Sequence, residues 1–396
     1  MGTGIEWTDA TWNPMTGCQK ISEGCRWCYA DTMAKRIQGN YRKLEGEGKP
    51  IPAGIKRYRD GFAPAFHPDA LGEPLRWMKP RRVFVCSMSD LFHTSFSFEQ
   101  IAAVFGVMAA CPQHQFQVLT KRVDRALKFY EWLQDRIEYH GGWCPGGAAQ
   151  VCFMEAMKYT SEISLGQMMG EVDERVPWPL PNVWVGVTVE NQRAADERIP
   201  LLLKVPAAVR FLSCEPLIGP VDLVETFEDV IGSLGAGRLC DTWTLHGNSM
   251  DWVIAGGESG PKARPSHPDW FRQLRDQCQA AGVAFFFKQW GRWHPTFPLY
   301  HDQDSWVDDN HDQELFAEGP WTDRGVVLHR NGQRTEDWEG QPSVDGNPWL
   351  MDPVGKGKAG RVLDGRTWDE YPEQKREAVD GCCPSSPGLE TPAYTG

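Results

Sequence analysis

The stretch TWNPMTGCQKISEGCRWCYA (residues 11–30) gathers three cysteines, Cys18, Cys25 and Cys28, directly after the first strand-like run of the chain. Three clustered thiolates can bind three corners of a cubane iron–sulfur cluster. No fourth cysteine lies nearby in the sequence, so one iron would stay open to bind and activate a small molecule. The pattern therefore favours a catalytic cluster.

Two other roles for these cysteines stay open. A structural zinc site needs a fourth ligand, and no second Cys or His pair follows at the usual spacing, so His67 or His93 would have to supply it. A disulfide is disfavoured because the chain begins MGTGIEWTD, without the charged and apolar regions of a secretory signal. We therefore expect a cytoplasmic protein.

Composition agrees with a globular enzyme. The 396 residues are 41% hydrophobic and 24% charged, which suits one large α/β-barrel domain or two ordinary domains. No apolar run approaches the ~20 residues that span a bilayer, so we expect no membrane partner. The net charge of -12 argues against a chain that coats nucleic acid, although a local basic cleft stays open. Among the 18 tryptophans, a few can serve as stacking platforms for a base.

Short apolar runs alternate with amphipathic helical segments along the chain. The predicted strands are residues 10–14, 82–88, 116–120, 183–189, 209–214, 251–257 and 283–289. The predicted helices are residues 29–37, 96–111, 123–137, 191–205 and 267–282. Near-continuous apolar strands indicate a parallel sheet, and repeated strand–helix units predict a barrel or an open doubly wound sheet.

Polar residues follow one predicted strand after another, where a barrel would build its active site. They are Ser87, Ser89, Asp90, Thr120, Lys121, Arg122, Glu190, Asn191, Ser213, Glu215, Glu258 (which follows Gly256 and Gly257), Lys288 and Gln289. A single polar strand end is usually a solvated loop, but repetition at strand after strand favours a shared rim. The fold prediction is an α/β chain forming a partial TIM-type (β/α)6 barrel with about one extra strand.

With its cysteine loop and polar rim, the chain resembles the radical S-adenosylmethionine (SAM) superfamily. The usual cysteine motif of this superfamily is C-x3-C-x2-C, whereas six residues separate Cys18 from Cys25 here. The aromatic residue that precedes the third cysteine in the superfamily is present as Trp27. A closer resemblance is to a phage-associated radical-SAM-like family named for a three-cysteine motif, and a more distant one is to the spore photoproduct lyase branch. The closer one rests on TWNPMTGCQKISEGCRWCYA, VFVCSMSDLFH, QVLTKR, VGVTVENQ, FLSCEPLIGPV, WVIAGGESG, FFFKQWG and GRVLDGRTWDEYP.

The resemblance implies cofactors and their ligands. Cys18, Cys25 and Cys28 would bind a [4Fe-4S] cluster, and SAM would chelate its fourth iron. An external reductant such as flavodoxin or ferredoxin would supply the electron that cleaves SAM to methionine and a 5′-deoxyadenosyl radical, which abstracts hydrogen from the substrate. Strand order and similarity assign the SAM contacts to Trp27, Ser89, Asp90, Lys121, Thr188 and Glu190. Among these, Ser89 and Asp90 would receive the ammonium, Lys121 the carboxylate, and Thr188 and Glu190 the ribose.

The expected substrate is a nucleobase or nucleotide in a phage DNA or nucleic-acid modification pathway, in the host cytoplasm. This expectation rests on family context and on the aromatic content. The residues assigned to catalysis are Glu215, Glu258, Cys214 and Lys288, with Arg122, Gln289 and Trp290 as further substrate contacts and Cys86 as a second possible hydrogen donor. A buried inert thiol is the commoner state of both cysteines. The alternatives are a radical SAM enzyme acting on a peptide or small metabolite, a zinc-stabilised binding module, and a catalytically silent barrel.

The chain is expected to divide into a barrel and an extension. The barrel would span residues 1–290, with an insertion between its third and fourth strands at about 139–181 that contains Cys144 and Cys152 and is a possible lid. Residues 291–372 would pack on the barrel, and residues 373–396 would form a flexible tail.

Overall fold

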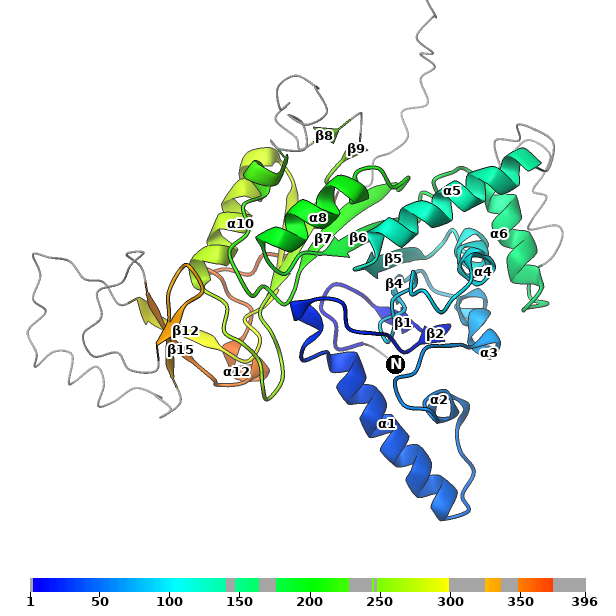
Figure 1. Cartoon of the computed structure of the whole chain (residues 1–396), viewed down its shortest axis with the longest axis horizontal. Helices are drawn as coiled ribbons and strands as arrows, with labels where there is room; N and C mark the ends of the chain where they lie inside the picture. Colours follow the sequence, from blue (N-terminus) through cyan, green and yellow to red (C-terminus); the bar gives the residue numbers. More distant parts are fainter. Residues whose placement is uncertain are drawn as a thin grey trace, which may run out of the picture.

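A seven-stranded parallel sheet forms the centre of the protein (Figure 1). The computed structural model describes residues 3–139, 147–163, 176–227, 244–245, 248–298, 325–335 and 348–372. In sheet order the strands are β1 (Ala10–Trp12), β4 (Arg82–Val85), β5 (Gln115–Thr120), β6 (Val183–Thr188), β7 (Val209–Cys214), β10 (Trp252–Gly256) and β11 (Ala284–Gln289). All seven predicted strands are therefore confirmed. Neighbours follow sequence order, so the sheet curls in one direction as a half-barrel and does not reverse as a doubly wound sheet does.

Helices cover the outer face of this sheet. The five predicted helices are confirmed as α1 (Tyr29–Gly46), α4 (Phe98–Ala109), α5 (Val123–Tyr139), α8 (Gln192–Leu202) and α10 (Pro268–Ala281). Their ends follow local chemistry: Ser97 and Gln100 form a capping box on α4, Asn191 caps α8, and Gly282 ends α10 in the left-handed conformation. Apolar residues of α4, α5, α8 and α10 share one core with alternate strand residues such as Val185.

The inner face of the sheet is closed by aromatic side chains. Strand alternation turns one set of residues inward, and these form a separate buried cluster of Trp7, Phe84, Trp184, Phe211, Trp252 and Phe286, with Val209 and Ile254. Trp252 lies at its centre, fully buried, with the rings of Trp7 and Tyr371 at 6.2 and 5.1 Å. This aromatic floor fills the lumen below the carboxyl edge of the strands, where the predicted polar rim lies.

The C-terminal extension packs on the half-barrel. Strands β12 (His294–Pro298), β15 (Trp349–Asp352), β13 (Val326–Leu328) and β14 (Arg334–Thr335) form an antiparallel sheet. The final described segment then runs antiparallel beside β11, where the amide of Phe287 donates to the Trp368 carbonyl at 2.9 Å. Tyr371 ends on the aromatic floor, with the Arg82 guanidinium 4.7 Å from its ring centroid. The predicted tail, residues 373–396, lies outside the described residues.

The insertion packs against the outer helices. Helix α6 (Gly147–Met157) approaches α4 so closely that a Cβ on Gly106 would lie 2.2 Å from the Cys152 carbonyl oxygen. Cys152 is fully buried there, and Cys144 lies outside the described residues. Because this part of the insertion belongs to the helix layer, the structure gives no support to a lid at the polar rim.

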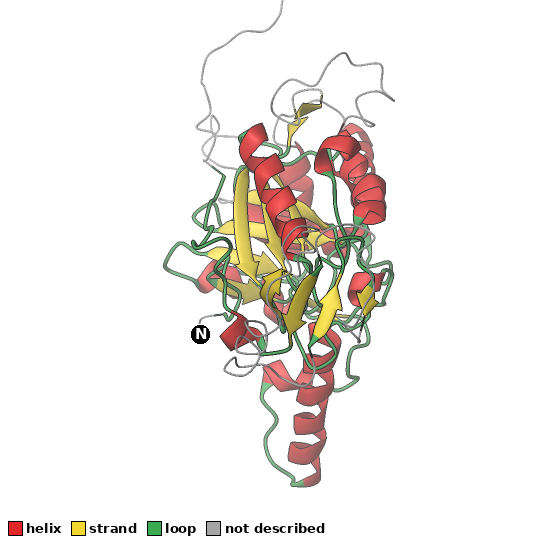
Figure 2. Cartoon of the chain, turned by 90° about the vertical axis from the view of Figure 1, so that its left-hand side faces the viewer, coloured by secondary structure: helices red, strands yellow, loops and turns green. Residues whose placement is uncertain are grey.

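Helix α1 and the short α2 (Ala53–Lys56) extend away from the sheet (Figures 1 and 2). The remaining elements are β2 (Met15–Thr16), β3 (Ala65–Phe66), β8 (Thr244–Leu245), β9 (Asn248–Ser249), α3 (Pro68–Leu71), α12 (Lys356–Ala359) and the 3-10 turns η1 (Glu23–Cys25) and η2 (Glu73–Arg76). Among the described helices, none has the length and apolar character needed to cross a bilayer.

Candidate functional site

Gly17 anchors the base of the cysteine loop, residues 17–28, to the segment that follows β4. Its amide donates to the Met88 carbonyl at 2.9 Å, and its carbonyl accepts from the Ser89 hydroxyl at 2.6 Å. The φ of Gly17 is +81°, and a Cβ would lie 2.2 Å from the Ala63 carbonyl oxygen. Only glycine fits such a close approach at positive φ, so the chain direction is fixed immediately before Cys18. Ser89, a predicted SAM contact, therefore holds the loop itself.

Asp90 joins the segment after β4 to the end of β5. Its Oδ1 accepts hydrogen bonds from the Thr120 hydroxyl at 2.7 Å and the Phe92 amide at 3.0 Å, and its Oδ2 accepts from the Lys121 amide at 3.0 Å. The carboxylate thus fixes where Lys121 leaves the sheet. Within the described residues Oδ2 accepts one bond, which leaves it capacity for a further donor.

Lys121, Glu190 and Arg198 form a buried charge cluster under the loop. The Glu190 Oε2 lies 2.7 Å from Arg198 Nη1 and 3.4 Å from Lys121 Nζ, and the Glu190 side chain is 1% exposed. Burial opposes the charge of Glu190, but Lys121 and Arg198 outweigh it and lower its pKa to about 2. A Cβ on Gly24 would lie 3.2 Å from the Glu190 carboxyl carbon and 3.3 Å from Lys121 Nζ. The charge cluster therefore supports the cysteine loop from below.

Arg264 fastens the other side of the loop to the segment after β10. Its Nε and Nη2 donate to the two oxygens of Glu258 at 2.8 and 2.7 Å, and its own amide donates to Glu258 at 2.8 Å. Nη2 also donates to the Glu23 carbonyl at 3.1 Å. Nearby, Lys262 Nζ lies 4.8 Å from the ring centroid of Trp27. Glu258 is 5% exposed and fully engaged, so it positions Arg264 and does not face the lumen as a free carboxylate.

The three cysteines are half-buried and form no disulfide. Burial and the Asp90 carboxylate raise the pKa of Cys18 to about 11. Burial alone would raise the pKa of Cys25 too, but the Lys121 ammonium and hydrogen bonds from the Ser22 turn outweigh it and lower that pKa. The surroundings of Cys25 therefore favour its thiolate form, whereas those of Cys18 oppose it.

The histidines that the zinc alternative requires do not join the cysteines. In the described part of the chain, no three His, Cys, Asp or Glu side chains are placed to hold one metal ion. His67 shares a 2.8 Å hydrogen bond with the Thr16 hydroxyl, and His93 Nδ1 accepts from the Ser95 amide at 3.1 Å. Because the cysteines of a cubane cluster bind different irons, three free thiols on one anchored loop are the type of ligand that such a cluster uses.

Glu215 and Lys288 face each other across the later strands. Their Oε2 and Nζ atoms lie 2.8 Å apart, and Glu215 Oε1 accepts from Gln289 Nε2 at 3.1 Å. The two charged side chains are 19% and 12% exposed. A Cβ on Gly256 would lie 3.4 Å from the Glu215 carboxyl carbon, so the bare strand end leaves room for this pair. These predicted catalytic residues do come together.

Other predicted residues lie elsewhere. Cys214 is fully buried in the helix-facing core, because strand alternation turns its neighbour Ser213 inward, and Cys86 also lies in that core. Cys214, which we predicted as a possible hydrogen donor, thus lies in the buried state that is the commoner one for such a thiol. Arg122 donates to the Gln19 carbonyl at 3.2 Å, so it contacts the cysteine loop and does not face it from across the rim. Trp290 is buried, with its indole nitrogen donating to the Val362 carbonyl.

Sequence reasoning missed three basic residues that hold the site: Arg198, Lys262 and Arg264. Arg264 contacts Glu23 across 241 positions, a pairing that no local pattern reveals. The only available signal was the pair of basic residues in GGESGPKARP, directly after β10. Arg198 lies within the predicted helix 191–205, and nothing in that pattern singled it out.

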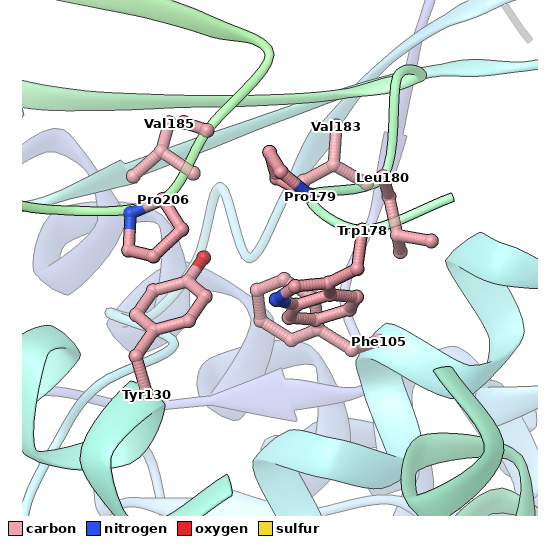
Figure 3. Close-up of a pocket in the computed structure, with 9 residues that line it drawn as sticks. Phe105, Tyr130, Trp178, Pro179, Leu180, Val183, Val185 and Pro206 are labelled. Carbon is pink, nitrogen blue, oxygen red and sulfur yellow. The ribbon is translucent and has the colours of Figure 1, made fainter. Parts of the chain in front are cut away.

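A small pocket lies away from this site (Figure 3). It is lined by Phe105, Tyr130, Trp178, Pro179, Leu180, Val183, Val185, Pro206 and Ala207. Val183 starts β6, so the pocket lies among apolar side chains of the helix layer, at the amino end of the strand. It is a packing gap and contains no group that the cysteine loop uses.

Fold and site together define a mixed α/β protein whose curled parallel sheet carries a three-cysteine loop at its carboxyl edge. A family model described as Protein of unknown function (DUF5131) matches residues 2–372, and the chain belongs to this family. Comparisons with curated proteins and with solved structures gave no match.

Proposed function

We propose that the chain is a radical SAM enzyme of the phage-associated type, built on a partial (β/α)6 barrel with about one extra strand. One observation carries the proposal: a loop with free Cys18, Cys25 and Cys28 is fixed across the carboxyl edge of a parallel half-barrel. Side chains from segments after β4, β5, β6 and β10 hold it there. A structural zinc loop does not need such anchoring to an enzyme-like rim.

The cysteines would hold a [4Fe-4S] cluster that, when bound and reduced by a flavodoxin or ferredoxin, supplies the electron for cleaving SAM to methionine and a 5′-deoxyadenosyl radical. The chain's own residues would bind SAM and orient it. Asp90, with a free lone pair on Oδ2, would accept the SAM ammonium, and Lys121 would bind the carboxylate. Trp27 and Thr188 would contact the rest of SAM. Ser89 and Glu190 act chiefly by keeping the cysteine loop in place.

Substrate would bind on the opposite part of the rim, above the aromatic floor. Glu215 Oε2 and Lys288 Nζ offer an acceptor and a donor 2.8 Å apart, a pairing that suits the polar edge of a nucleobase. The buried aromatic rings below exclude water from the lumen, which protects a radical from unwanted hydrogen donors. We propose a nucleobase or nucleotide as substrate, in a rearrangement or hypermodification reaction.

Anaerobic purification tests the proposal. We expect a brown protein with absorbance near ~400 nm and about four irons per chain, which forms 5′-deoxyadenosine when reduced in the presence of SAM. The Cys25→Ala variant should lose the iron while keeping the circular dichroism spectrum of the native chain. A colourless protein with bound zinc would instead identify a structural module.

Two further results would narrow or reject the proposal. An iron-containing protein that never forms 5′-deoxyadenosine would be a silent barrel. Deuterium transfer into 5′-deoxyadenosine from labelled peptides or metabolites, with none from nucleotides, would reject the proposed substrate class while leaving the chemistry intact.

A further inference from the structure

Charge is distributed unevenly along this acidic chain. Residues 29–62, which contain α1, α2 and the turns beside them, hold eight basic and four acidic residues, a net charge of +4. The other 362 residues hold 33 basic and 49 acidic residues, a net charge of -16. We call residues 29–62 the arm. A basic segment on an acidic protein is a local feature that needs a partner of opposite charge to explain it.

The arm buries little against the rest of the molecule. Of the 18 residues of α1, only Ala30 and Ala34 are buried, and they pack with Tyr58 and Met88 near its first turns. Beyond these turns the helix projects from the sheet beside α2 (Figures 1 and 2). A projecting helix with so small an apolar face gains little from packing, which fits a surface that contacts another molecule.

One face of α1 is basic and lies opposite its packing face. Lys35 and Arg42 are seven residues apart, as are Arg36 and Lys43, so the two pairs form two neighbouring rows along the helix. All four residues are exposed. Among the described residues, Arg36, Arg42 and Lys43 have no ion-pair partner, whereas Lys35 pairs with Asp31 at 3.0 Å. The basic face therefore presents charges that the chain itself does not neutralise.

Glycines lie between these two rows. Gly39 and Gly46 fall at helical positions between the basic pairs, and a Cβ on either would meet no atom within 4 Å. Glycine inside a helix costs about 1 kcal/mol relative to alanine, so helix stability does not favour Gly39, whereas Gly46 is the last residue of α1. Two bare positions flanked by cations leave an open strip along which a chain of anionic groups can lie close to the helix backbone.

The positions of the charges favour a polynucleotide over an acidic protein. Helix α1 is about 27 Å long, and Arg42 lies about 21 Å along the axis from Cys28, where the cysteine loop ends. Each strand of a duplex carries one phosphate per about 3.4 Å of helix axis, so one strand could run beside the whole face. An acidic redox protein would need to dock near the cysteines and would gain nothing from cations at the far end of the arm.

We infer that the basic face of α1 binds the phosphate backbone of a nucleic acid and guides it toward the cysteine loop. This inference deepens the proposed function, because it makes the substrate a nucleotide within a polymer. The exposed cations Arg26 and Lys262 continue the charge toward the rim, at 5.4 and 4.8 Å from the centroid of the Trp27 ring.

Fluorescence anisotropy with labelled oligonucleotides tests the inference on the full chain, without SAM or reductant. Single-stranded DNA and a duplex of the same sequence distinguish the two forms of the polymer. The test variant carries Arg36→Ala, Arg42→Ala and Lys43→Ala, which keep high helix propensity. The matched control carries Lys128→Ala, Arg193→Ala and Lys204→Ala, three exposed basic residues outside the arm with the same change in charge.

We expect the arm variant to bind at least about tenfold more weakly than the control at low salt, with unchanged circular dichroism. Its slope of log affinity against log salt should fall by about 2 to 3, because each lost phosphate contact removes about 0.7 to 0.9. Equal binding by the two variants, absence of DNA binding, or equally effective competition by polyglutamate would overturn the inference. Formation of 5′-deoxyadenosine is measured separately. Failure of the DNA-binding test therefore leaves the proposed radical SAM chemistry intact, and failure to form 5′-deoxyadenosine leaves the DNA-binding inference intact.

Discussion

Replacing Arg264 with alanine should both destabilise the protein and release the cysteine loop. Arg264 makes two side-chain hydrogen bonds to Glu258 and one to the Glu23 carbonyl, and its own side chain is 14% exposed. Among the described residues, the substitution leaves the 5% exposed Glu258 carboxylate with the residue-264 amide as its one hydrogen-bond donor. Removing one partner of a buried ion pair costs about 3 to 5 kcal/mol. We expect the lower end of that range, because the Arg264 side chain is not fully buried.

Two assays measure these effects on the same protein. Urea unfolding gives the change in the free energy of unfolding, and thiol labelling followed by mass spectrometry gives the alkylation rates of Cys18, Cys25 and Cys28. Arg264→Lys is the matched control, since it keeps the charge and loses the forked geometry, and it should lie between the native chain and the alanine variant. If Arg264→Ala lowers the free energy of unfolding by less than about 1 kcal/mol and leaves the cysteine alkylation rates unchanged, Arg264 does not hold the loop in place.

Three further predictions test other parts of the structure. Trp252→Ala should lower the free energy of unfolding by about 3 to 5 kcal/mol in urea denaturation, since the fully buried indole supports the aromatic floor; a cost near that of a surface substitution would contradict this packing. Asp364→Asn should lower the free energy of unfolding by about 0.5 to 1 kcal/mol at neutral pH, because Asp364 pairs with Arg272 and Arg275 at a partly exposed site. Burial opposes its charge, but the two arginines lower its pKa below the ordinary 3.8, so this contribution is present above pH 3.8 and is lost as the pH falls through the lowered pKa. Thermal unfolding of both proteins across that acidic range should show the difference disappear, and a constant difference would argue against the pair. Finally, Lys121→Ala should weaken SAM binding in calorimetry, and unchanged affinity in a folded variant would remove Lys121 from the SAM site.

Sequence patterns predicted the central sheet well for a physical reason. Most strands are runs of largely apolar residues buried on both faces, and α4, α8 and α10 have capped starts as well as apolar stripes, so local sequence carries the signal. The antiparallel sheet of the C-terminal extension was not predicted. Its strands are short, and their pairing joins segments such as Val326–Leu328 and Trp349–Asp352 that lack a clear periodic pattern.

The candidate site was only partly predictable. Polar strand ends identified Asp90, Lys121, Glu190, Glu215 and Lys288, because strand polarity alone places them on one edge. The sequence could not indicate which side chains the protein uses to hold its own loop. Glu258 was predicted as a catalytic residue, whereas its pairing with Arg264 indicates a positioning role. Cys214 was predicted as a hydrogen donor, with a buried inert thiol as the commoner state, and the strand register turns it toward the helices.

Mössbauer spectroscopy of anaerobically reconstituted protein tests the central claim most directly. The account predicts the spectrum of a [4Fe-4S] cluster in the native chain, its loss in the Cys25→Ala variant, and a change at one iron when SAM is added. A chain that assembles no cluster, or a cluster whose Mössbauer spectrum does not change when SAM is added, would contradict the claim that the anchored cysteine loop is the catalytic centre.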